Sequence, residues 1–264
     1  MGFLTELYAF LATTANITLR TDFSIDREIP CDGLLDSLEM LNRDSDIYGV
    51  LFGSAHQLFS LIPRIIQFAR EVANGGDHSI AILMEYYEEA IQSWRPRPLP
   101  PPRFACNVED SVSRDPNPAT KSPDGALGTT TDIQIAGEIY QQALLTFLYT
   151  AFHGRKAPTS ELQNKMDGFL TEFVNKLSSL PRGSAMETTM MWPILVAGSC
   201  MRRPDHQQFT LGVLSESQFS MASLERCRYV LSSLWEEQTS DERMYGLYGL
   251  ELVMLKRDIN ICVG

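Results

Sequence analysis

The element that decides the fold occupies residues 132–154, which read DIQIAGEIYQQALLTFLYTAFHG. Its apolar residues recur at intervals of three and four, the spacing that places side chains on one face of a helix. Asp132 opens the stretch, and Gly154 closes it where a helix C-cap is expected. These features predict one long helix that begins at Asp132 and ends at His153.

The same period recurs on both sides of this helix, and no stretch shows the sustained alternation of apolar and polar residues that is typical of strands. We therefore predict an all-α fold, a multi-helix bundle or array. The further helices are expected over residues 4–15, 34–41, 58–72, 80–94, 160–177, 188–201, 205–214, 221–237 and 241–256.

Capping residues support several of these helix starts. Thr159 or Ser160 precedes the helix over 160–177, and Asp241 precedes the last helix. Ser184 and Glu187 have the Ser-x-x-Glu spacing of a capping box directly ahead of residues 188–201. We expect Pro63 to kink the helix over 58–72, because proline has no backbone N–H.

One composition shift divides the chain. Residues 95–130 are poor in apolar side chains and begin with RPRPLPPP, which favours an extended polyproline start. We predict one helical domain over residues 1–264, in which blocks 1–94 and 131–264 are joined by a long Pro-rich loop at 95–130. The segment is interpreted as a surface loop, with a docking motif for a proline-reading domain as the alternative.

Composition and charge exclude several classes of function. The 264 residues are 44% hydrophobic and carry a formal charge of −11, which would repel a phosphate backbone. We therefore expect no direct nucleic-acid binding by this chain. No segment approaches the roughly 20 apolar residues of a membrane span, so no membrane insertion is expected either.

Neither metals nor cofactors are indicated by the motifs. The five cysteines are scattered singly, without a Cys-x-x-Cys pair, so we predict no zinc site and a reducing compartment, nucleus or cytoplasm. Phosphate-binding glycine loops, His-Glu-x-x-His and Gly-x-Ser-x-Gly are absent. We expect no bound cofactor.

Three isolated residues are the acid/base candidates if the chain is an enzyme: His56, His153 and Glu187. The histidines have unperturbed pKa values of about 6.5, near neutrality. The structural alternatives are capping or packing for the histidines and the capping box for Glu187. Met190 and its neighbouring methionines cluster around Trp192, and thioethers suit either an apolar ligand pocket or a core.

Three segments resemble landmarks of one known family. They are residues 46–53 (DIYGVLFG) leading into 58–65 (LFSLIPRI), residues 136–149 with AGEIYQQALL, and residues 191–199 (MWPILVAGS). They are similar to the fungal-specific transcription factor domain, the regulatory domain that follows a binuclear zinc cluster in many fungal regulators. Gln141 stands where that family often has Arg after its Tyr, and no cysteine motif matches the zinc cluster. The resemblance covers nearly all of this chain, which we expect to begin partway into the family's domain, truncated at its N-terminus.

The resemblance implies a regulatory domain that senses a small apolar ligand or a partner through a helical pocket. Tyr140, Met190, Trp192 and Pro193 are the pocket candidates. It also implies a homodimer, or a heterodimer with a transcription regulator. Two alternatives stay open: a standalone fungal secondary-metabolism enzyme of cyclase, dehydratase or isomerase type on the same scaffold, and a scaffold protein without a ligand.

Overall fold

A computed structural model describes residues 10, 55–73, 80–96, 130–154, 156–218 and 222–259. Over these residues the fold is all-α without strands, which confirms the predicted fold class. The elements are α3 (His56–Phe59), α4 (Leu61–Ala73), α5 (Ile80–Ser93), α6 (Thr130–His153), α7 (Ser160–Ser179), a 3₁₀ turn η1 (Ala185–Thr189), α8 (Met191–Ser199), α9 (Pro204–Glu216), α10 (Ala222–Gln238) and α11 (Gly246–Lys256).

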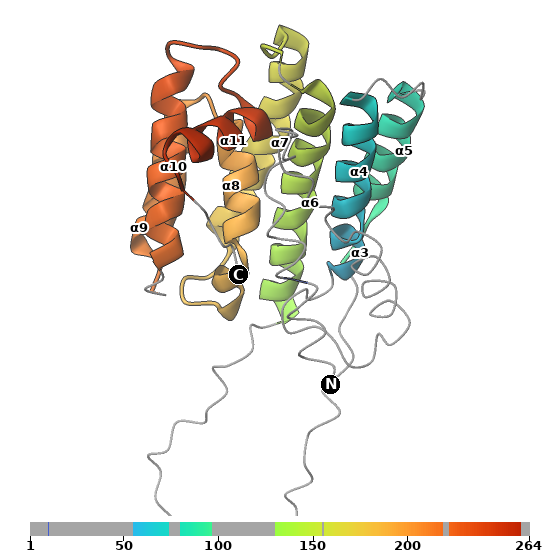
Figure 1. The fold of residues 1–264 in the computed structure, drawn as a ribbon. Coiled ribbons are helices and arrows are strands. Elements are labelled where there is room, and N and C mark those ends of the chain that lie inside the picture. Colours follow the sequence, from blue (N-terminus) through green and yellow to red (C-terminus); the bar gives the residue numbers. More distant parts are fainter. Residues whose placement is uncertain are drawn as a thin grey trace, which may run out of the picture.

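Helix α6 lies at the centre of the array (Figure 1). It packs against α3, α4 and α5 on one side and against α7, α8 and α11 on the other. Helices α9 and α10 complete the far edge through contacts with α7, α8 and α11. The stretch 132–154 therefore forms the central helix. This helix begins at Thr130, two residues before the predicted start at Asp132.

Helix α8 is enclosed on every side. All nine of its residues, Met191 to Ser199, are buried, as expected of a helix that is apolar around its whole circumference. Trp235 of α10 donates its indole N–H to the carbonyl of Gly198 at 2.9 Å. A Cβ on Gly198 would lie 2.9 Å from Leu231 Cδ1, so α8 and α10 pack too closely there for a larger residue.

Helix α4 starts later than its period predicts. The helix over residues 58–72 is divided at Ser60, whose hydroxyl donates to the carbonyl of Gln57 at 2.7 Å. Pro63 then falls in the first turn of α4, where a backbone N–H has no partner within the helix. The expected kink at Pro63 is therefore replaced by a helix start.

Two predicted helix starts are wrong. Ser184 caps the 3₁₀ turn η1, and the α-helix begins only at Met191. Pro193 cannot donate to the carbonyl of Thr189 four residues earlier, which separates the two elements. Asp241 caps a tight turn by accepting from the backbone N–H of Arg243 at 3.0 Å.

The last helix begins at Gly246, which follows that turn with φ of +62°. Since an ordinary residue rarely adopts this conformation, a glycine here marks the end of the turn and interrupts the helix expected from Asp241.

Several sequence predictions lie outside the described residues. They are the helix over 4–15 except Phe10, the short helix over 34–41, and the Pro-rich segment after Pro96. Phe10 itself is buried, with its ring 5.9 Å from that of Phe59. Among the helices that are described, none combines the length and the apolar character that crossing a membrane would take.

Candidate functional site

An apolar pocket lies between α7, η1, α8, α9 and the start of α10. Its volume is about 140 Å³. We call it the η1 pocket, and its walls are Leu177, Ser178, Leu180, Arg182, Glu187, Met190, Met191, Ile194, Phe209, Val213, Leu214, Glu216, Ser217 and Leu224. Most of these side chains are apolar, the usual character of small-molecule sites.

The 3₁₀ turn that forms one wall is fastened to α6 at both ends. At its start, the Ser184 hydroxyl donates to Asp132 Oδ2 at 2.7 Å and accepts from the backbone N–H of Met186 at 3.4 Å. At its end, the Tyr140 hydroxyl donates to the carbonyl of Thr189. The pocket wall is therefore held by two side-chain bonds to the central helix.

The bond from Tyr140 has a local cause. In an α-helix the carbonyl of Thr189 would accept from the backbone N–H of residue 193, but Pro193 has none. Thr189 is buried, so its carbonyl needs a donor from elsewhere in the protein. The Tyr140 hydroxyl supplies it, and burial raises the pKa of Tyr140, which keeps that hydroxyl protonated.

Glu187 brings a carboxylate to the pocket wall. Its Oε1 accepts from the backbone N–H of Gly183 at 2.7 Å, in a turn where Gly183 has φ of +77°. Its Oε2 is buried and has no hydrogen-bond partner among the described residues. A buried carboxylate oxygen without a donor is costly.

Charge at the mouth of the pocket is balanced. Arg182 and Glu216, which both line the pocket, form an ion pair at 2.5 Å with largely exposed side chains. Such a pair is screened by solvent and contributes little to stability. With Arg182 neutralised by Glu216, Glu187 gives the pocket a net negative charge.

The four predicted pocket residues divide between wall and core. Met190 lines the η1 pocket. Tyr140, Trp192 and Pro193 are buried and are absent from its walls. The Tyr140 ring stacks 6.1 Å from that of Trp192, whose Nε1 has no partner among the described residues. These residues support the pocket through η1 and α8.

The three acid/base candidates are not brought together. Glu187 lies on η1, beside the first turns of α6, whereas His153 ends that helix and places its Nε2 3.1 Å from the carbonyl of Ala157. Because α6 has 24 residues, its two ends are roughly 36 Å apart. His56 opens α3, and its side chain lies outside the described residues. The enzyme hypothesis stays a prediction from the sequence.

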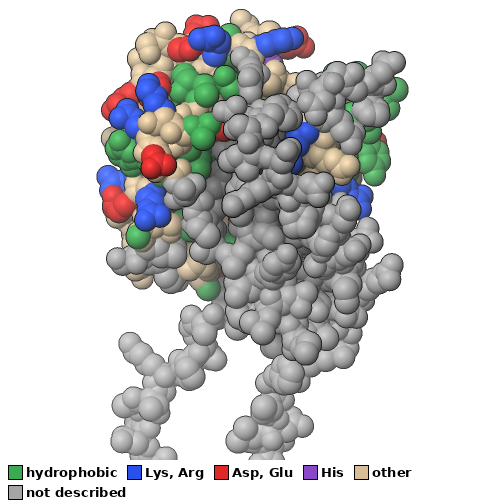
Figure 2. All heavy atoms as spheres, viewed as in Figure 1, with side chains coloured by type: hydrophobic (Ala, Val, Ile, Leu, Met, Phe, Trp, Pro, Cys, Tyr) green, Lys and Arg blue, Asp and Glu red, His purple; other side chains and the backbone are tan. Residues whose placement is uncertain are grey.

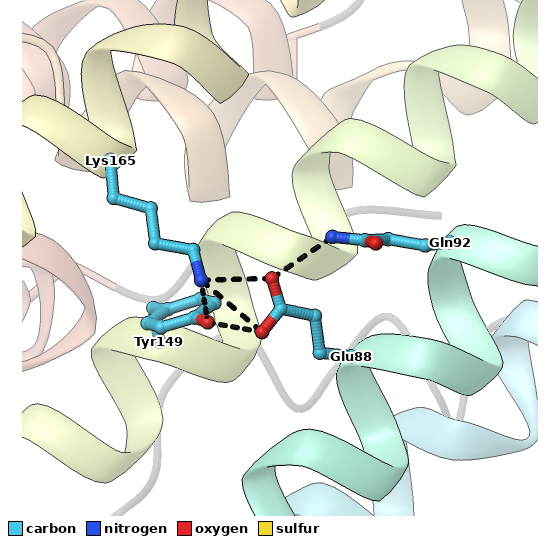
Figure 3. Close-up of polar contacts among 4 residues, drawn as sticks. All are labelled: Glu88, Gln92, Tyr149 and Lys165. Carbon is cyan, nitrogen blue, oxygen red and sulfur yellow. Dashed lines mark hydrogen bonds and ion pairs between the residues drawn. The ribbon is translucent and has the colours of Figure 1, made fainter.

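A polar cluster joins α5, α6 and α7 on another side of the central helix (Figure 3). The Tyr149 hydroxyl donates to Glu88 Oε2, and the Lys165 ammonium donates to Tyr149 and lies 2.9 Å from Glu88 Oε1. Gln92 donates its amide N–H to Glu88 Oε1 at 2.9 Å. Lys165 also lies 4.3 Å from the centre of the Tyr149 ring, a cation–π distance.

The protonation states in this cluster favour a structural role. Burial alone would raise the pKa of Glu88, but hydrogen bonds from Tyr149 and Lys165 outweigh it and hold that pKa below its usual value. Burial raises the pKa of Tyr149, and the bond to Glu88 raises it further. Burial opposes the charge on Lys165, yet its two partners raise its pKa. Each group keeps its ordinary charge near neutral pH, so the cluster provides no activated base or nucleophile.

A second hollow of about 480 Å³ lies beside Trp94 and Pro96, between α3, α4 and the end of α5. Its lining residues run from Gln57 to Pro96.

Acidic and basic side chains lie close to one another on the described part of the face in Figure 2. Ion pairs join oppositely charged neighbours elsewhere in the described chain, such as Arg243 and Asp241 at 2.8 Å. No group of three or more His, Cys, Asp or Glu side chains in the described ranges could hold a metal ion.

Sequence reasoning missed the wall that α9 contributes to the η1 pocket. Phe209 and Val213 lie four residues apart on one helical face, which is a periodicity signal. The period shows that this face is covered, but it does not show which helix covers it. The partner of Glu187 was also missed, since it is the N–H of Gly183 and not that of Ser184.

The fold and the pocket define the class: an all-α array around a central helix, with a small apolar pocket whose 3₁₀ wall is bonded to that helix. The family model described as the fungal specific transcription factor domain matches residues 1–263. The chain therefore belongs to that family, which confirms the resemblance seen in its sequence and indicates a role in transcriptional regulation. No curated protein and no solved structure matches the chain.

Proposed function

We propose that this chain is a ligand-sensing regulatory domain of fungal transcriptional control, with the η1 pocket as its sensing site. The observation that carries the proposal is the pocket wall itself, a 3₁₀ turn that is fastened to the central helix at both ends. Family membership supplies the regulatory context and favours the nucleus as the place of action.

The effect of a ligand bound in the pocket can be transmitted to the rest of the fold through η1 and α6. A ligand that contacts η1 and α9 favours whichever position of these elements fits it best, which shifts the balance between conformations. The bonds Ser184–Asp132 and Tyr140–Thr189 link η1 to α6, and α6 contacts helices on both sides of the array. We propose this route as the path of the signal.

We propose that this chain does not contact DNA directly. A net charge of −11 disfavours approach to a phosphate backbone. We propose that the domain acts as a homodimer or as a heterodimer with a transcription regulator that contacts DNA.

A pocket-filling variant tests the sensing role. Val213→Trp places a large ring in the η1 pocket, and Gln208→Trp places the same ring on the exposed side of the same helix as the matched control. We expect Val213→Trp to change the transcript profile of the fungal host at equal protein level, and Gln208→Trp to leave it as in the wild type. Native mass spectrometry after incubation with host extract should show a retained small molecule that Val213→Trp alone loses.

Val213→Phe is a milder version for the case in which the tryptophan unfolds the protein, as judged by circular dichroism. If folded pocket-filled protein gives the same transcripts and retains the same extract compounds as the control, the η1 pocket is not the sensing site.

A further inference from the structure

Exposed apolar side chains gather on α5. Three of the five large hydrophobic residues that are exposed in the described ranges belong to this helix: Ile80, Ile82 and Tyr86. Ile82 is 64% exposed and Tyr86 is 58% exposed. The other two, Tyr229 and Leu255, lie on different helices. Single exposed apolar residues are ordinary, whereas a group of them indicates a contact surface.

The exposed residues of α5 form a row away from its buried face. The helix packs on α6 and α4, and its buried residues are Tyr87 and Ile91. Ile82 and Tyr86 are four residues apart, so they lie together on another side of the helix. In Figure 2, hydrophobic side chains lie at the edge of the molecule where Figure 1 places α5. The row is therefore open to a partner.

A row of carboxylates runs beside the apolar row. Glu85 and Glu89 follow Ile82 and Tyr86 by three residues each, which makes them neighbours on the helix surface. Both are exposed, and neither is paired with a basic side chain within the described ranges. The remaining carboxylate of α5, Glu88, already has a lysine partner. The helix itself contains no Lys or Arg, so it cannot neutralise this row.

The two rows together specify the chemistry of a partner. A surface that covers Ile82 and Tyr86 also faces Glu85 and Glu89, and a carboxylate that loses water without gaining a counter-charge is costly. The partner is therefore expected to bring Lys or Arg. An amphipathic helix can present apolar side chains at intervals of three and four with basic side chains alongside them.

A second copy of this chain fits α5 less well. Its own α5 would bring only further carboxylates, and each copy carries a net charge of −11. Two such surfaces repel each other when like charges meet across the contact. A regulator that contacts DNA has the complementary charge, because nucleic-acid-binding proteins carry clustered Lys and Arg.

We call this surface the α5 face, and its residues are Ile82, Glu85, Tyr86 and Glu89. We infer that the α5 face binds a basic amphipathic helix of a protein partner. The apolar side chains of that helix pack on Ile82 and Tyr86, and its Lys or Arg side chains pair with Glu85 and Glu89. This inference rests on the proposed heterodimer with a transcription regulator and specifies where this chain is contacted.

The test titrates the full chain with two fluorescent helical peptides, and binding is followed by fluorescence anisotropy. The first peptide carries a leucine stripe between two rows of lysines. The second keeps the leucines and has glutamates in place of the lysines. We expect the wild type to bind the lysine peptide and to show no measurable binding of the glutamate peptide.

Two variants separate the contributions of the rows. Ile82→Gln with Tyr86→Gln should weaken binding of the lysine peptide by about tenfold or more, because the apolar row is lost. Glu85→Gln with Glu89→Gln should weaken it about fivefold, the size of two exposed ion pairs. Glutamine is a good helix former, so α5 should stay folded, as checked by circular dichroism.

Matched controls make the same chemical changes elsewhere. Leu255→Gln with Tyr229→Gln removes two similarly exposed apolar side chains from α11 and α10. Glu236→Gln with Glu242→Gln removes two exposed carboxylates away from α5. Both controls should bind the lysine peptide as tightly as the wild type does.

Three results would overturn the inference. One is a wild type that fails to bind the lysine peptide, and another is equal weakening by the α5 variants and their controls, which would mean unspecific attraction to an acidic chain. The third is self-association in sedimentation velocity that Ile82→Gln with Tyr86→Gln abolishes, because the α5 face would then bind a second copy.

The proposed function is tested separately. Ligand sensing is read from the transcripts and extract compounds of Val213→Trp, and the heterodimer is read from co-purification of the wild type with a transcription regulator. If the variant with Ile82→Gln and Tyr86→Gln retained that regulator, the heterodimer would stand and the α5 face would be rejected as its contact.

Discussion

The Tyr140 hydroxyl is predicted to compensate for the N–H that Pro193 lacks. Tyr140→Phe removes the donor to the Thr189 carbonyl and keeps the ring, which lies 4.5 Å from that of Phe59 and 6.1 Å from that of Trp192. Thr189 is only 3% exposed, so water cannot readily replace the lost donor. We expect a loss of about 1–3 kcal/mol in the free energy of unfolding, the range for a buried acceptor left without a partner.

The second half of the prediction concerns Pro193→Ala. Alanine restores a backbone N–H at the position that bonds the Thr189 carbonyl in a regular helix. In this background the Tyr140 hydroxyl is no longer the needed donor, so Tyr140→Phe should cost less than about 1 kcal/mol. The two substitutions should therefore be coupled by about 1–2 kcal/mol, as for residues that share one hydrogen-bond network.

Urea unfolding of the four proteins, followed by far-ultraviolet circular dichroism, measures this cycle. The dependence of the free energy on urea must stay the same in all four for the comparison to hold. Thermal unfolding gives a second measure, at about 2–4 °C per kcal/mol for a chain of this size. An equal cost of Tyr140→Phe with proline and with alanine at 193 would refute the reasoning, because the hydroxyl would then not be compensating for the missing N–H.

Three further predictions follow from burial and packing. Gly198→Ala should lower the thermal midpoint, with a loss of about 1–3 kcal/mol from overpacking against Leu231, whereas Gly212→Ala, which meets open space in α9, should not lower it. Burial lowers the pKa of His206, so the unfolded chain binds its proton more readily than the folded chain; stability should therefore fall as the pH drops below about 6.5. His206→Gln should make the free energy of unfolding depend less steeply on pH, as measured by urea unfolding between pH 5 and pH 7.5. An unchanged pH dependence would mean that other groups cause it. Burial raises the pKa of the Cys200 thiol to about 12, so iodoacetamide should label it in the unfolded but not in the native protein, as read by peptide mass spectrometry.

Helix positions were predictable because their signal is local. The period in residues 132–154 located α6 to within two residues of its start, and the cap at Thr159 is confirmed by its bond to the N–H of Leu162 at 3.2 Å. The errors at Ser184 and Asp241 arose where the backbone leaves the α-helical path for a 3₁₀ turn or a positive φ. Caps of such turns have the same residue types as caps of helices.

The candidate site was less predictable because its contacts are distant in sequence. Met190 could be named as a pocket residue from composition, and it lies on the wall of the η1 pocket. Phe209 lines the same pocket but could not be placed there, since nothing in the sequence states that α9 packs against α7 and α8. The bond from Tyr140 to Thr189 spans 49 residues, so only the packed structure reveals why a tyrosine and Pro193 depend on each other.

The enclosure of α8 restricts how this chain can change by mutation. Because all nine residues from Met191 to Ser199 face other parts of the protein, no position on the helix can drift freely in size or polarity. A larger residue at Gly198, for instance, calls for a smaller one at Leu231, and a change at Trp192 calls for one at Phe147 or Tyr140. Viable substitutions in α8 should therefore arise as compensated pairs with α6 or α10, and deep mutational scanning of this helix should find few tolerated single changes.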